Sequence, residues 1–206
     1  MQLAQPDTGT STLIAVTLGA LLATLGGVIA TQLENRVRKS ERERNAALLF
    51  GEILSTLELI LKLADESRGR GDPYGPLTMR MVAGARREMD IYDRNREALY
   101  DLRDASTRVK IHGLAIRVSM ALDGVLEATP EIAAVELTAK TPGLTKKARD
   151  EIAERLERMR ASRAGSFDFA MEMAELIKPV VGELGALAKH SFEAMTRLAQ
   201  TVADGD

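Results

Sequence analysis

The side chains that most often bind metals or transfer protons are scarce in this sequence. It contains two histidines, His112 and His190, and no cysteine. The histidines fall in different predicted helices, and neither belongs to a His-Glu-x-x-His motif or follows a glutamate by three residues. Those spacings place zinc or di-iron ligands on one helix face. We therefore expect no metal site, no cofactor and no disulfide or thiolate chemistry.

Nucleophile and phosphate-binding motifs are missing as well. No serine stands in a Gly-x-Ser-x-Gly sequence, and the glycines of residues 69–75 are not followed by the Gly-Lys-Ser/Thr of a phosphate loop. Acidic pairs such as Asp65-Glu66 are adjacent in predicted helices, where neighbouring side chains diverge and cannot share a proton. The sequence predicts a protein that is not an enzyme and binds no small-molecule substrate.

The charge pattern argues against nucleic acid as a partner. All 28 Lys and Arg residues follow position 33, and the 30 acidic residues less Asp7 leave 29 in the same part of the chain. Nucleic-acid binders usually carry a basic excess gathered on one face. Aromatic residues make up 3% of the chain and tryptophan is absent, so bases would find few side chains on which to stack.

The elements that must position any site begin with an uncharged run at the amino terminus. Residues 8–33 contain no charged side chain. We predict a transmembrane helix over residues 12–33, because about 20 residues at about 1.5 Å each cross a hydrocarbon core. Residues 1–11 would be a short extracytoplasmic tail. A cleaved signal peptide is the competing interpretation, but it requires a basic segment before the apolar run.

Basic residues flank only the carboxyl end of this predicted span. They are Arg36, Arg38, Lys39, Arg42 and Arg44. The positive-inside rule then predicts an outside amino terminus, with residues 34–206 in the cytoplasm. The basic segment is either a solvated flank or a contact with anionic lipid headgroups.

Small residues recur along one side of the predicted span at steps of three and four. They are Ala15, Gly19, Ala23, Gly26, Gly27 and Ala30. Membrane helices associate where small residues let two backbones approach closely. We therefore predict a contact there with a membrane protein partner or with a second copy of the chain. The alternative is that glycine and alanine are simply common in membrane helices.

Three long helical patterns fill the rest of the chain. Apolar residues at three- and four-residue steps predict helices over about 34–68, 76–128 and 144–203, with a short helix at 130–139. The first continues the membrane helix, and the glycines and prolines of residues 69–76 end it. The predicted fold class is all-α: one amino-terminal transmembrane helix continuing into an antiparallel three-helix cytoplasmic bundle, residues 34–206.

Several positions in these patterns are weak points for a continuous helix. The second helix would be roughly 78 Å long against about 51 Å for the cytoplasmic part of the first. It must therefore bend, break or overshoot, and Gly84 and Gly113 are its weakest positions. The third pattern could be interrupted at Gly165-Ser166, and Pro179 is our candidate hinge or kink.

Residues 109–126 form the most apolar part of the second pattern and carry Lys110 and Arg117 among the apolar positions. Two interpretations remain open. The segment is either a surface that contacts the lipid interface or a partner, or the best-buried part of the bundle core.

The layout resembles that of small bacterial membrane proteins with one amino-terminal span and a helical cytoplasmic domain, an architecture that carries no activity. We expect a single-pass protein of the bacterial inner membrane. The first hypothesis is a non-enzymatic accessory or scaffold subunit that docks on a larger membrane protein complex through the small-residue face. The alternative is a signal-relay or adaptor protein that uses the continuous first helix.

Overall fold

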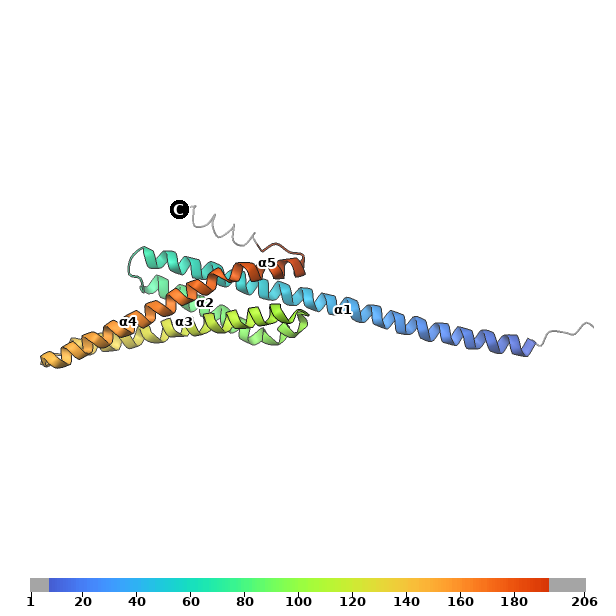
Figure 1. The fold of residues 1–206 in the computed structure, drawn as a ribbon, viewed down its shortest axis with the longest axis horizontal. Helices are drawn as coiled ribbons and strands as arrows, with labels where there is room; N and C mark the ends of the chain where they lie inside the picture. Colours follow the sequence, from blue (N-terminus) through green and yellow to red (C-terminus); the bar gives the residue numbers. More distant parts are fainter. Residues whose placement is uncertain (1–7, 193–206) are drawn as a thin grey trace, which may run out of the picture. The chain divides into compact units, whose positions relative to one another are not determined.

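The computed structural model describes residues 8–192, with the side chains of residues 8–17, 20, 21, 23, 25 and 28 excepted. Within this range the elements are helices α1 (Thr8–Gly69), α2 (Pro76–Asn95), α3 (Ala105–Ala139), α4 (Lys146–Glu175) and α5 (Ile177–Ala188), with a 3-10 helix η1 (Arg96–Asp101) between α2 and α3 (Figure 1). The predicted all-α class is confirmed.

The chain divides into two compact units, residues 1–42 and residues 43–206. Among the residues whose side chains are described, no helix offers an apolar segment long enough to cross a membrane. The predicted tail, residues 1–11, lies outside that set, and so does much of the predicted span, residues 12–33. The transmembrane assignment therefore stays a prediction.

The core of the second unit starts from the apolar stripe of α1. Phe50, Leu54, Leu57 and Leu61 follow one another at three- and four-residue steps and are almost completely buried. Burying each such side chain contributes about 1.5–3 kcal/mol. The partners come from every other helix, and they include Val82, Met89, Ile111, Val118, Leu122, Phe167, Ile177 and Leu184.

The described part of the second unit is a four-helix bundle, in which α1, α2 and α3 pack with α4 and its continuation α5. This corrects the three-helix prediction. The helical pattern predicted over 76–128 is divided in two, because α2 ends at Asn95 and α3 begins at Ala105. Asp104 caps α3 by accepting hydrogen bonds from the amides of Ser106 (3.2 Å) and Thr107 (2.9 Å). The break therefore falls in residues 96–104 and not at Gly84 or Gly113, which both lie inside helices.

The reversal between α2 and α3 is held by buried side chains in the connection. Leu99 in η1 and Leu102 just after it are both buried in the core. Contacts between Arg86 and Asp123 and between Tyr92 and His112 then show α2 and α3 packed antiparallel. The two apolar anchors explain why the chain turns here, although no glycine or proline marks the place.

The short helix predicted at 130–139 is the end of α3, which runs through Pro130. Proline lacks the amide that would bond to the carbonyl four residues earlier. Thr129 donates its hydroxyl to the Val125 carbonyl at 2.9 Å, in the same turn.

The helix predicted over 144–203 begins instead at Lys146, passes Gly165 without a break, and is interrupted at Leu176 between α4 and α5. Residues 193–203 of that prediction lie outside the described range.

Helices α3 and α4 run side by side as an antiparallel hairpin (Figure 1). The two helices approach closely at Gly124, where a Cβ atom would lie 2.7 Å from the Ser166 hydroxyl oxygen and 3.2 Å from its Cβ. Farther along, Ile132 and Leu156 are buried and Arg160 pairs with Glu136 at 2.6 Å. The absence of a side chain at Gly124 therefore allows the hairpin to close.

We predict that Gly124→Leu destabilises the fold by about 1–3 kcal/mol, because the new side chain must push α4 away. The matched control is Gly165→Leu in α4, since no heavy atom lies within 4 Å of its added Cβ. The stability of that variant should rise by up to about 1 kcal/mol, because leucine has a higher helix propensity than glycine. Thermal unfolding followed by circular dichroism measures both. Equal melting temperatures for the two variants would contradict the close packing at Gly124.

Candidate functional site

The predicted transmembrane contact residues lie in the first unit. Gly19, Gly26, Gly27 and Ala30 are exposed, and a Cβ added at any of these three glycines would meet no heavy atom of the chain within 4 Å. Thr31 donates its hydroxyl to the Gly27 carbonyl at 2.9 Å. The side chains of Ala15 and Ala23 lie outside the described set. The described part of the small face thus has room for another helix.

The basic residues that follow are divided between the two units. Arg36, Arg38, Lys39 and Arg42 are exposed residues of the first unit, and Arg38 pairs with Glu34 at 2.6 Å.

Arg44 belongs to the second unit and has a structural role that the sequence did not indicate. Its Nε atom donates to the Ala188 carbonyl at 3.1 Å, so it satisfies a free carbonyl at the end of α5. The preceding residue, Glu43, accepts a hydrogen bond from the Arg103 amide at 3.1 Å and pairs with the Arg103 guanidinium at 3.2 Å. These two residues join α1, α5 and the α2–α3 connection at one end of the bundle.

At the other end, a cluster of cations and aromatic rings holds the α1–α2 turn against α4. The Arg163 guanidinium carbon lies 3.6 Å from the centroid of the Tyr74 ring, and that of Arg68 lies 4.6 Å from the Phe167 ring. Arg68 also pairs with Asp168 at 2.5 Å. A cation over an aromatic ring contributes about 0.5–2 kcal/mol. The cluster therefore stabilises the turn.

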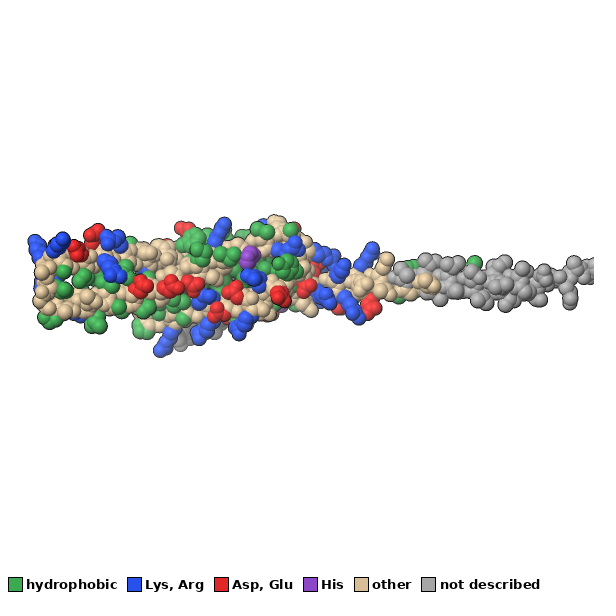
Figure 2. All heavy atoms as spheres, turned by 90° about the horizontal axis from the view of Figure 1, so that it is seen from below, with side chains coloured by type: hydrophobic (Ala, Val, Ile, Leu, Met, Phe, Trp, Pro, Cys, Tyr) green, Lys and Arg blue, Asp and Glu red, His purple; other side chains and the backbone are tan. Residues whose placement is uncertain are grey.

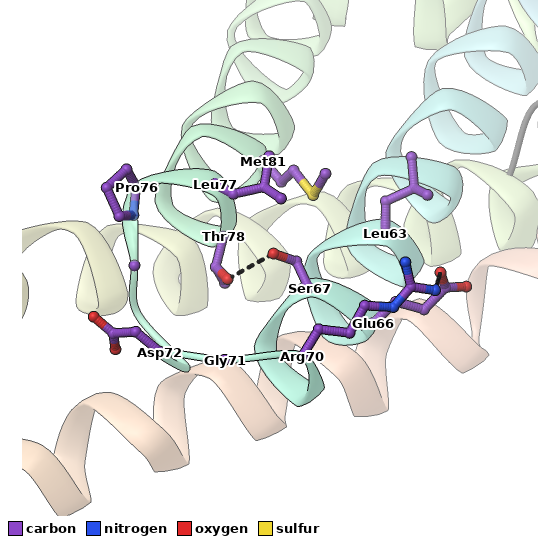
Figure 3. Close-up of a pocket in the computed structure, with 11 residues that line it drawn as sticks. Leu63, Glu66, Ser67, Arg70, Gly71, Asp72, Pro76, Leu77, Thr78 and Met81 are labelled. Atoms are coloured by element: carbon purple, nitrogen blue, oxygen red, sulfur yellow. Dashed lines mark hydrogen bonds and ion pairs between the residues drawn. The ribbon is translucent and has the colours of Figure 1, made fainter. Parts of the chain in front are cut away.

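A hollow of about 300 Å³ beside this turn is lined by the ends of α1 and α2 (Figure 3). Its two hydroxyls, on Ser67 and Thr78, lie 3.0 Å apart and bond to each other (Figure 3). Arg70 pairs with Glu66 at 3.4 Å, and Asp72 accepts from the Tyr74 amide at 3.1 Å. These polar groups all have partners inside the turn, so they do not form a ready ligand site.

The histidine that lies in α3 is a hydrogen-bond partner in the bundle. His112 Nδ1 lies 2.8 Å from the hydroxyl oxygen of Tyr92. The Tyr92 side chain is among the largest that are fully buried. Burial raises the pKa of Tyr92 to about 12. The described residues contain no group of three or more metal-ligating side chains.

A groove of about 690 Å³ between α3 and the start of α5 is the feature best suited to binding, and we call it the α3–α5 groove. Its apolar lining combines Val109, Gly113 and Leu114 of α3 with Leu176, Pro179 and Val180 from the other side. Lys110, Arg117 and Glu183 provide its charged groups. Pro179, the predicted hinge or kink, lies in the first turn of α5 and in the wall of this groove.

The groove bears on the two interpretations left open for residues 109–126. Burial in the core is confirmed for one face of α3, whereas contact of the other face with lipid or a partner stays a prediction. Ile111, Leu114, Val118 and Leu122 are buried in the core, whereas the side chains of Val109 and Met120 are 71% and 68% exposed. The periodicity marks both faces as apolar, but only the packing of the other helices decides which face is covered.

The charged side chains do not form a field of one sign. On the face drawn in Figure 2, basic and acidic side chains are both present along the second unit, with apolar side chains among them. No protein-family model, curated protein or solved structure matches the chain. No role is therefore carried over from a relative, and the α3–α5 groove and the small face of α1 are the two candidate contact surfaces.

We predict that Tyr92 ionises about two pH units later than an ordinary tyrosine. Its folded pKa of about 12 lies above the usual value of 10.0, so the unfolded state loses this proton first. The contribution to stability is complete below pH 10 and is lost as the pH rises toward 12.

Phenolate absorbance of the three tyrosines measures this directly. Tyr92→Phe should remove the late phase and cost about 0.5–1.5 kcal/mol through the lost hydrogen bond. Tyr100→Phe is the matched control, because Tyr100 is 82% exposed and its removal should leave the late phase unchanged. A late phase that survives in Tyr92→Phe would contradict the assignment.

Proposed function

We propose that this chain is a non-enzymatic, membrane-anchored helical protein that acts as an accessory or scaffold subunit of a larger membrane protein complex. The observation that supports this best is the continuity of α1 from Thr8 to Gly69. Its first part lies in the uncharged run, and its last part supplies Phe50, Leu57 and Leu61 to the bundle core. A helix shared in this way attaches the bundle to the element that anchors it.

The proposed contact with the complex is the small-residue face of the first unit. The open space above Gly19, Gly26 and Gly27 supports it, because close backbone approach is the main way in which helices associate in lipid. The basic residues from Arg36 to Arg42 would contact anionic headgroups, at about 1 kcal/mol each near the surface. The proposed location is the bacterial inner membrane, with the amino terminus outside.

A signal-relay or adaptor role is the second candidate, and the same continuous helix favours it. Movement of the membrane segment would pass along α1 into the bundle. A relay would meet a transient cytoplasmic partner, whereas a scaffold would stay with one complex at fixed stoichiometry.

We predict the topology from the charge asymmetry around residues 12–33. Because the chain has no cysteine, single labelling sites can be introduced without background. Gln5→Cys should react with a membrane-impermeant maleimide in spheroplasts. Ser162→Cys, at an exposed position of α4, should react only after lysis. Reaction of Ser162→Cys before lysis would overturn the predicted topology, and recovery of the protein in the soluble fraction would overturn the anchoring.

We predict that Gly19→Ile combined with Gly27→Ile releases the protein from its complex, because two branched side chains keep a partner helix away. Both glycines have open space around them, so the fold of the chain should be unaffected. The measurement is affinity purification in mild detergent followed by mass spectrometry. The expected result is one large membrane complex at fixed stoichiometry with the wild type and its loss with the double variant.

The matched control is Leu18→Ile combined with Leu22→Ile, at exposed positions outside the small face. It should keep the complex. If the wild type returns only itself, and neither double variant changes this, the accessory-subunit proposal fails. A transient cytoplasmic partner, retained by both variants, would favour the relay instead.

A further inference from the structure

The α3–α5 groove presents apolar surface that no other described part of the chain covers. Val109 and Leu176, on its two sides, are 71% and 48% exposed, while Leu114 and Val180 form its floor. From Ala105 to Arg117 the groove follows α3 for about 18 Å at 1.5 Å per residue. That length matches about three turns of a second helix lying alongside.

Gly113 lines this groove, and the packing of the chain does not require a glycine there. A glycine inside a helix costs about 1 kcal/mol relative to alanine. In α3 that cost is explained at Gly124, where α4 approaches closely, but an added Cβ at Gly113 meets no heavy atom within 4 Å. Gly165 and Gly182 are equally open, but neither lines the groove. At Gly113, the missing side chain leaves room for a backbone from outside.

The positive and negative charges that line the groove do not balance. Lys110 pairs with Glu183 at 2.5 Å, and both side chains are partly exposed, so this pair is worth little and can rearrange. Arg108, next to the groove, donates to the Leu102 carbonyl at 2.6 Å. Arg117 is exposed and has no ion pair with any residue that the structure describes. The uncompensated charge of the lining is therefore positive.

We propose that the α3–α5 groove binds an amphipathic α-helix of a partner protein, which crosses over Gly113, places apolar side chains at i, i+3, i+4 and i+7 against Val109 and Leu176, and directs a carboxylate to Arg117. Helices commonly bind in apolar grooves of this kind through such anchors. The inference rests on the proposed scaffold function and adds a second contact, in the bundle. A second copy of the chain fits less well, because pairing α3 with α3 brings like charges at Lys110 and Arg117 together.

The test uses the full chain in lipid nanodiscs and two labelled model helices of about twelve residues. Both peptides carry leucines at the anchor positions, with glutamates elsewhere in one and lysines in the other. Fluorescence anisotropy measures their affinity. Peptide partitioning into lipid is common to all samples, so differences between protein variants report the groove.

The structure predicts a different result for each variant. Gly113→Leu fills the groove and should weaken binding of the glutamate peptide about tenfold or more, as expected for blocking a central contact. Its melting temperature should not fall, because the new side chain has space and improves helix propensity. Arg117→Glu should reverse the preference between the two peptides. Gly165→Leu, about 16 Å along the helix from Leu176, should bind like the wild type.

Equal affinity of the glutamate peptide for all four proteins would overturn the proposal. So would a lower melting temperature of Gly113→Leu, which would give Gly113 a role inside the fold. Self-association that Gly113→Leu abolishes, without peptide binding, would assign the groove to a second copy and also overturn it. None of these results depends on the small face of α1, so a failure here and a failure of the transmembrane contact can be told apart.

Discussion

Burial of the apolar stripe of α1 is the interaction on which the second unit depends. Phe50 packs against Tyr92 of α2 with ring centroids 5.9 Å apart, and Gly51 leaves room for the ring of Phe192 after α5. Ser67 and Arg68 then bond to α2 and α4 at the opposite end. Because these contacts come from one helix, α1 determines where both ends of the bundle lie.

The ends of several helices are held by local hydrogen bonds outside this apolar stripe. Asp104 and Thr145 cap α3 and α4 through side-chain oxygens, and Arg44 satisfies a carbonyl at the end of α5. Lys189 ends α5 in a left-handed conformation with φ of 52°, which allows the His190 amide to bond back to Gly185. Each contact contributes little alone, but together they help to fix where α3 and α4 begin and where α5 ends.

Two glycines of α3 have different roles: one allows close packing inside the fold, and the other leaves space for a partner. Gly124 lets α4 approach, and Gly113 lies open in the α3–α5 groove three turns earlier. The groove lies between α3 and the junction at which α4 ends at Glu175 and α5 begins at Ile177. The proposed partner helix would occupy the exposed side of α3 at this junction.

The sequence by itself determined the helical class, the turn at residues 69–76 and the apolar stripe of α1, because helix periodicity and the glycine and proline positions are local properties. It did not predict the break at 96–104, since Leu99 and Leu102 become anchors only when the core around them exists. It also missed the continuation of α3 through Pro130 and the role of Arg44 at α5. The exposed and buried faces of residues 109–126 look alike in sequence. Only the tertiary structure decided between them, because burial depends on which other helix lies against each face.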